Sequence, residues 1–131
     1  MQPSALAEAR EWLVRADEDL QVTERLLQTA PPILASAAYH AQQAAEKALK
    51  AFLAAHNVAP PLTHNLEDLL ASCVALDATF GQFAAAARML TPYATRFRYP
   101  GGPLAPSSTE AEEALQLADN VVRFVHGQLG V

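Results

Sequence analysis

The order of apolar and polar residues along the chain predicts helices, and no segment alternates with the two-residue period of a strand. From about Ser4 to Gln28, apolar residues recur at alternating steps of three and four, which is the spacing of one helix face. We expect Ser4 to cap this helix, with Glu8 near its positive end. Pro31 and Pro32 should end it. The predicted stripe consists of Leu6, Ala9, Leu13, Ala16, Leu20, Thr23 and Leu27.

A second helix is predicted from about Ile33 to His56, and its broad apolar face is rich in alanine. Side chains this small let another helix approach closely. Asn57 is expected to close the helix, and Pro60 and Pro61 prevent its continuation. The predicted face consists of Leu34, Ala38, Ala41, Ala45, Ala48, Leu49, Phe52 and Ala55.

Two shorter helices should follow. One starts at Thr63, whose hydroxyl can accept from backbone N–H groups, and ends near Leu76, with Leu66, Leu69, Leu70 and Cys73 on its buried side. The next runs from about Thr79 to Leu90.

Pro92 interrupts this pattern, because proline lacks a backbone donor and clashes with the preceding turn. Either the helix kinks there, or Thr91 caps a new short helix with Pro92 at its first position. Tyr93 to Arg98 should continue that helix, and Tyr99 to Pro103 should form a loop.

The last helix should begin between Ser107 and Thr109, because acidic residues fill the turns that follow. Its predicted core stripe is Ala111, Leu115, Ala118, Val122, Val125 and Leu129. Together these segments predict an all-α fold, an up-and-down antiparallel bundle of four to five helices, in a single domain over residues 1–131.

Composition excludes several classes of protein. With 51% hydrophobic and 18% charged residues over 131 positions, the chain has the means to form a packed core. Its one cysteine, Cys73, cannot form an internal disulfide, and in its apolar run we expect a buried, inert thiol. No Cys/His cluster has zinc spacing, and no nucleotide-binding glycine motif or nucleophile elbow is present, so we expect no metal or cofactor.

The chain shows no secretory signal and no apolar run of membrane-spanning length, so we expect a cytoplasmic protein with no membrane partner. The net charge of −5 argues against a wholly basic nucleic-acid-binding surface, although a local basic patch is compatible with it.

The second predicted helix carries a polar stripe that could bind phosphates and base edges. Its residues follow steps of four, three, four and three, and they include both lysines of the chain. The alternative is a solvated helix face with a surface ion pair between Glu46 and Lys50. The stripe consists of Ser36, His40, Gln43, Lys47 and Lys50, with Tyr39 and Glu46 beside it.

Two further features could contact an anion. Between Tyr93 and Pro100, Arg96 and Arg98 alternate with aromatic residues, which suits phosphate binding and base stacking. Alternatively, Phe97 or Tyr99 anchors this segment while the arginines meet helix carboxylates or carbonyls.

His64 lies beside the expected cap Thr63, where a helix N-terminus can host an anion, although a lone histidine at such a position more often has a structural role. His56 and His126 are interpreted as surface residues near helix ends and receive no role.

Four short signatures occur together in one order. They are Trp12-Leu13 with Ala16-Asp17 and Asp19-Leu20, the block Ala41-Gln42-Gln43-Ala44-Ala45-Glu46-Lys47-Ala48-Leu49-Lys50-Ala51, Thr63-His64-Asn65-Leu66, and Arg98-Tyr99-Pro100. From about residue 5 to 129, the chain resembles the small prokaryotic HEPN domain (higher eukaryotes and prokaryotes nucleotide-binding).

The resemblance implies a helical bundle that forms a homodimer and pairs with a minimal nucleotidyltransferase in a two-component system of toxin–antitoxin type. It also implies binding of a nucleotide or RNA. The expected phosphate- and nucleotide-binding residues are His40, Gln43, Lys47, Lys50, Arg96, Arg98 and Tyr99, with Glu46 and His64 as further candidates.

Some relatives in this family are metal-independent RNases that use an arginine followed, after four to six residues, by a histidine. None of the four histidines here has an arginine at that spacing. We therefore expect a binding and interaction module that is not itself catalytic and that dimerises through its alanine-rich faces. The alternatives are an RNase with a degenerate motif, using Arg98 with His40 or His64 as acid/base, and a purely structural partner.

Overall fold

The computed structural model describes residues 1–102 and 104–131, and Pro103, which ends the loop expected after Arg98, lies outside the described residues. The described residues form helices and no strand, so the predicted all-α fold is confirmed. None of these helices is long and apolar enough to cross a bilayer. The elements are α1 (Pro3–Gln28), α2 (Leu34–Ala55), α3 (Leu66–Leu76), the 3₁₀ helix η1 (Ala78–Phe83), α4 (Ala84–Leu90), the 3₁₀ helix η2 (Thr91–Ala94) and α5 (Ser108–Leu129).

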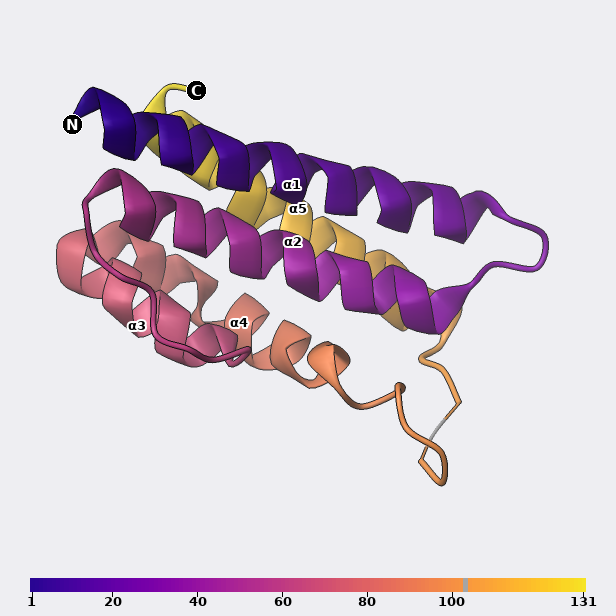
Figure 1. Ribbon diagram of the computed structural model, residues 1–131. Helices are drawn as coiled ribbons and strands as arrows, with labels where there is room; N and C mark the ends of the chain where they lie inside the picture. Colours follow the sequence, from indigo (N-terminus) through magenta and orange to yellow (C-terminus); the bar gives the residue numbers. More distant parts are fainter. Residues whose placement is uncertain (103) are drawn as a thin grey trace.

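Helix α2 lies at the centre of the bundle, with α1 on one side, α3 and α4 on the other, and α5 behind it (Figure 1). Helices α1 and α2 are antiparallel neighbours. The connection from residue 56 to 65 then leads the chain back along α2, because the backbone carbonyl of His64 accepts from Gln42 in the middle of that helix. As a result α3 runs in the same direction as α2, and Cys73 reaches the carbonyl of Leu49.

The central place of α2 follows from its side chains. Most of its residues are buried, and the predicted apolar face is buried except for the half-buried Leu34. Phe52 then joins Phe80, Phe83 and Phe124 in an aromatic cluster at one end of the core. Because the alanine-rich face of α2 is used inside the chain, it is not free to form a dimer.

Two helix ends agree with the prediction and one does not. Asn57 adopts a left-handed φ of 58° and closes α2 as expected. Ser107 and Glu110 form a reciprocal capping box at the start of α5. The prediction that Ser4 caps the first helix is wrong: Gln2 occupies that position without a side-chain bond, and Pro3 suits the first turn.

The start of α3 also differs from the prediction. The cap is Asn65, whose Oδ1 accepts from the backbone N–H of Glu67 at 2.8 Å. Thr63 lies outside the helix, where its hydroxyl accepts from the N–H of Asn65 in a local turn. The prediction that the helix starts at Thr63 is therefore wrong, because the Thr63 hydroxyl is used in the turn before the helix.

The predicted helix from Thr79 to Leu90 is divided. Its first part is η1, where Asp77 caps the turn through the N–H of Thr79, and only α4 has α-helical bonding.

After Leu90 the chain tightens into η2, with Pro92 in its first turn, so a new short helix forms. Thr91 does not cap it, because its hydroxyl donates to the carbonyl of Ala87 and accepts from the N–H of Leu66. The prediction that the helix continues to Arg98 is wrong, since residues 95–98 form turns.

Candidate functional site

A buried carboxylate on α1 organises one end of the polar stripe. The side chain of Asp19 is 9% exposed, and its Oδ1 accepts from Nδ1 of His40 at 2.8 Å. Its Oδ2 accepts from Nζ of Lys47 at 2.6 Å. Asp19 was quoted only as part of a family signature and not as a site residue, although a signal existed: it lies three residues after Ala16 and four before Thr23, on the apolar face of the helix. A charge at such a position needs partners from elsewhere in the fold.

A second buried carboxylate organises the other end. Glu46 accepts from Lys50 at 3.1 Å, from Nδ1 of His64 at 3.0 Å and from Nε2 of Gln42 at 3.2 Å. Burial raises the pKa of Glu46, but the hydrogen bonds from His64, Lys50 and Gln42 outweigh it, so the pKa lies below its usual value. Gln43 in turn donates to Oε1 of Gln42.

These contacts show that the part of the polar stripe with Lys47 and Lys50 is neither a free binding face nor a solvated one. Lys47 and Lys50 are both half-buried and each forms an ion pair within the chain. Lys50 also lies 5.4 Å from the centre of the Trp12 ring. His64 contacts the carboxylate of Glu46, and this contact links the segment before α3 to α2. Glu46 and its three donors, Gln42, Lys50 and His64, are therefore held together by contacts within the chain.

The accessible part of the stripe lies farther toward the start of α2. Here a groove of about 390 Å³ separates this half of the helix from the turn after η2. The carbonyl of Thr95 accepts from the N–H of Arg98 and closes that turn, which holds the guanidinium 4.3 Å from the centre of the Tyr39 ring. The groove is lined by Ala35, Ser36, Tyr39, His40, Phe97 and Arg98.

His40 and Arg98, which are far apart in sequence, therefore line the same groove. Arg96 and Arg98, which are close in sequence, line different grooves. Arg96 lines a different groove, together with Tyr93 and the acidic residues Glu110 and Glu113 at the start of α5. Phe97 stacks on Tyr93 with ring centres 5.9 Å apart, so it acts as the aromatic anchor considered from the sequence.

The other candidates lie outside this groove. Tyr99 is 69% exposed in the loop before α5. His126, which received no role, is half-buried and contacts Asp17 through Nε2. Burial raises the pKa of the Cys73 thiol to about 12, which is consistent with the expected inert cysteine.

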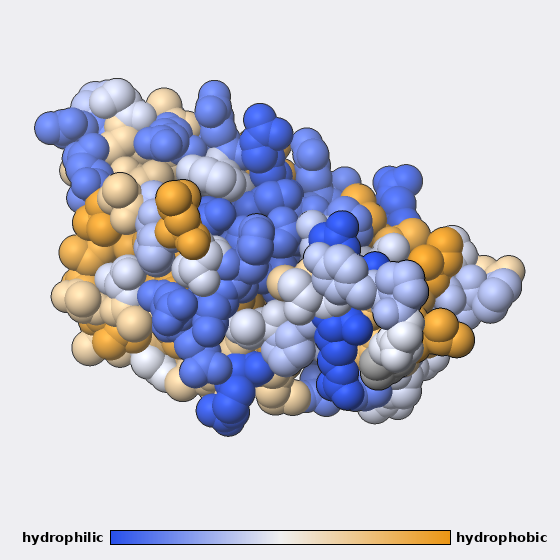
Figure 2. All heavy atoms as spheres, turned by 60° about the horizontal axis from the view of Figure 1, so that its bottom comes forward, coloured by the Kyte–Doolittle hydropathy of each residue, from blue (hydrophilic) through white to orange (hydrophobic). Residues whose placement is uncertain are grey.

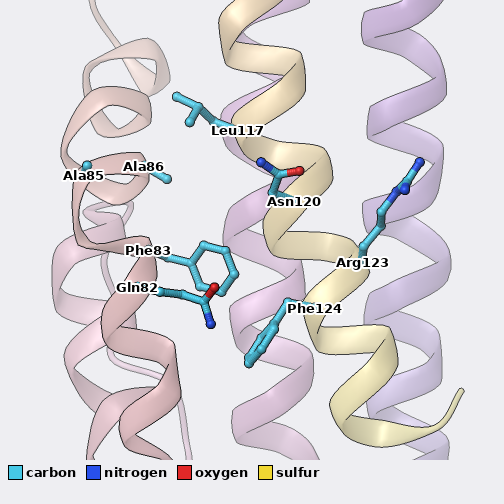
Figure 3. Close-up of a pocket in the computed structure, with 8 residues that line it drawn as sticks. All are labelled: Gln82, Phe83, Ala85, Ala86, Leu117, Asn120, Arg123 and Phe124. Carbon is cyan, nitrogen blue, oxygen red and sulfur yellow. The ribbon is translucent and has the colours of Figure 1, made fainter.

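Another groove, of about 540 Å³, lies between α4 and α5 and has a different character. Figure 3 shows Phe83 and Phe124 facing one another across it, while Arg123 points away. Arg123 also pairs with Asp119 on its own helix at 2.9 Å. This groove therefore offers apolar contact, and its one lining cation is already paired.

The face that includes α3 and α4 is mixed. Figure 2 shows hydrophilic residues across its middle, with hydrophobic patches toward both ends. Of the three grooves described above, the one beside His40 and Arg98 combines an unbalanced positive charge with aromatic surface, because Lys47 already balances Asp19.

Comparisons with known proteins show the family of this chain. A model of the HEPN domain matches residues 9–128, nearly the whole chain. The chain belongs to the HEPN domain family. This HEPN domain is also similar to TT1696 from Thermus thermophilus, whose crystal structure shares 35% sequence identity with it. That match has a TM-score of 0.76 and covers 92% of this chain and 97% of the other. No curated protein matches the chain.

Proposed function

We propose that this HEPN domain is a nucleotide- or RNA-binding and interaction module that is not itself catalytic, with its phosphate site in the groove beside α2. The observation that carries the proposal is the convergence of His40 and Arg98 on that groove from distant segments. A guanidinium can bind two phosphate oxygens at once. The rings of Tyr39 and Phe97 supply surface on which a base can stack.

The family membership supports the rest of the proposal. The domain would act in the cytoplasm as a homodimer and as the partner of a minimal nucleotidyltransferase, in a two-component system of toxin–antitoxin type. The dimer would use surfaces other than the buried face of α2.

The site assignment is tested by titrating the protein with AMP and with a short RNA at low and moderate salt. We expect binding that weakens with salt, because phosphate contacts release counterions. Arg98→Ala should weaken binding by roughly 10- to 100-fold and reduce the salt dependence. The matched control is Arg88→Ala, which removes an exposed arginine that lies on α4 and outside the groove. This variant should bind like wild type.

Two results would contradict this. If Arg98→Ala binds as tightly as wild type, the groove is not the phosphate site. If the wild-type protein binds neither ligand, the domain is an interaction subunit whose chemistry lies in its partner.

One observation favours a second candidate function, a metal-independent RNase with a degenerate motif. Asp19 orients His40 in the same groove as Arg98, so an acid/base and a phosphate-binding group lie together without the usual spacing in sequence. Incubating the protein with RNA in the presence of a chelator tests this candidate. Cleavage that disappears in His40→Ala and persists in His64→Ala would support it, and RNA that stays intact with the wild-type protein would exclude it.

A further inference from the structure

The contact between Asp19 and His40 is not needed to balance charge. The carboxylate of Asp19 already has an ammonium group, that of Lys47, at 2.6 Å. The contact with His40 can therefore serve orientation of the imidazole ring.

The carboxylate also determines which nitrogen of His40 carries the proton. An ionised carboxylate only accepts hydrogen bonds, and Oδ1 of Asp19 lies 2.8 Å from Nδ1 of His40. The proton must then be on Nδ1, which leaves Nε2 of the neutral ring as an acceptor.

That acceptor is open to a ligand. Among the residues that the structure describes, Nε2 of His40 has no hydrogen-bond partner, and no buried side-chain nitrogen or oxygen lacks one. Nε2 is therefore in reach of solvent. It lies on the ring edge away from Asp19, and His40 lines the groove together with Arg98.

We propose that Asp19 is a positioning residue that fixes His40 as the Nδ1–H tautomer, so that Nε2 accepts a hydrogen bond from a nucleotide whose phosphate is held by Arg98. The ligand half of this inference rests on the proposed function, whereas the tautomer half does not. His40 then contributes directed hydrogen bonding and Arg98 contributes the charge.

Nitrogen-15 NMR of the histidine side chains, at a mildly alkaline pH where imidazoles are neutral, tests the tautomer in the wild-type protein. We expect His40 to carry its proton on Nδ1. His126 is an internal reference with the opposite geometry, because its Nε2 contacts Asp17 at 3.1 Å, and it should carry the proton on Nε2. A wild-type spectrum with His40 protonated on Nε2 would overturn the proposal without any variant.

Asp19→Asn tests the positioning role, because an amide can donate as well as accept and no longer dictates the tautomer. We expect the proton of His40 to move toward Nε2 and the affinity for AMP to fall roughly tenfold, as for one lost hydrogen bond. Asp17→Asn changes the other histidine-bound aspartate of α1 and should alter neither His40 nor AMP binding.

The outcomes separate this inference from the proposed function. If Asp19→Asn binds AMP like wild type, Asp19 does not position the ligand contact. If the wild-type protein binds no AMP or RNA, the proposed function fails together with the ligand half of this inference, while the His40 spectrum still decides the tautomer.

Discussion

At the scale of single residues, two buried carboxylates account for the polar stripe of α2. Glu46 is only 3% exposed, yet the described neighbours satisfy its oxygens with donors from Gln42, Lys50 and His64. Removing the charge of Glu46 is therefore expected to destabilise the fold, because its donors lose an acceptor and Gln42 remains buried.

Glu46→Gln should lower the free energy of unfolding by about 1–3 kcal/mol at neutral pH. The pKa of Glu46 is lowered in the folded chain, so the unfolded chain takes up the proton first as pH falls. The stabilisation is therefore complete above the usual value of 4.5 and is lost as pH drops through the folded pKa.

Urea denaturation at several pH values measures this effect. The difference between wild type and Glu46→Gln should narrow in acid, whereas Glu24→Gln, at an exposed site on α1, should differ little from wild type at any pH. A Glu46→Gln difference that stays constant with pH would show that Glu46 is not stabilised in its ionised form.

At the scale of elements, local turn chemistry determined where helices begin. Ser107 and Glu110 satisfy each other's backbone N–H groups, and the N–H and hydroxyl of Ser107 hold the pKa of Glu110 below its usual value. This pair needs only neighbours within one turn, so the sequence was sufficient to place the start of α5. Thr63 was expected to cap α3, but Asn65 occupies that position, because the connection that meets α2 at His64 places the start of the helix later.

Ser107→Ala should lower the free energy of unfolding by about 1 kcal/mol, because the N–H of Glu110 loses its acceptor. Ser108→Ala is a matched control one residue later, inside the helix, and should change stability by less than about 0.5 kcal/mol. Chemical denaturation of both variants checks the difference. Equal effects would mean that the capping box does not stabilise α5.

At the scale of the whole molecule, the bundle depends on how closely other helices approach α2. Ala41 is 0% exposed in the middle of this helix, so no space remains for a larger side chain. The close packing explains why an alanine-rich chain forms a stable core.

Ala41→Leu should therefore be destabilising by about 1–3 kcal/mol, although leucine is a good helix former. Ala7→Leu, on the exposed face of α1, introduces the same side chain without crowding and should be nearly neutral. Urea denaturation of the two variants makes the comparison. If Ala41→Leu is as stable as Ala7→Leu, the core is looser than its burial indicates.

The sequence by itself determined the long helices α1, α2 and α5, the buried face of α2 and the family, because each depends on periodicity, caps or motifs that lie within short stretches of chain. Only the tertiary structure decided the site. Asp19 meets His40 and Lys47 across 21 and 28 residues, and that contact depends on how α1 is rotated against α2. Arg96 and Arg98 line different grooves because the chain leaves its helical path after η2, and helical spacing no longer predicts where their side chains point.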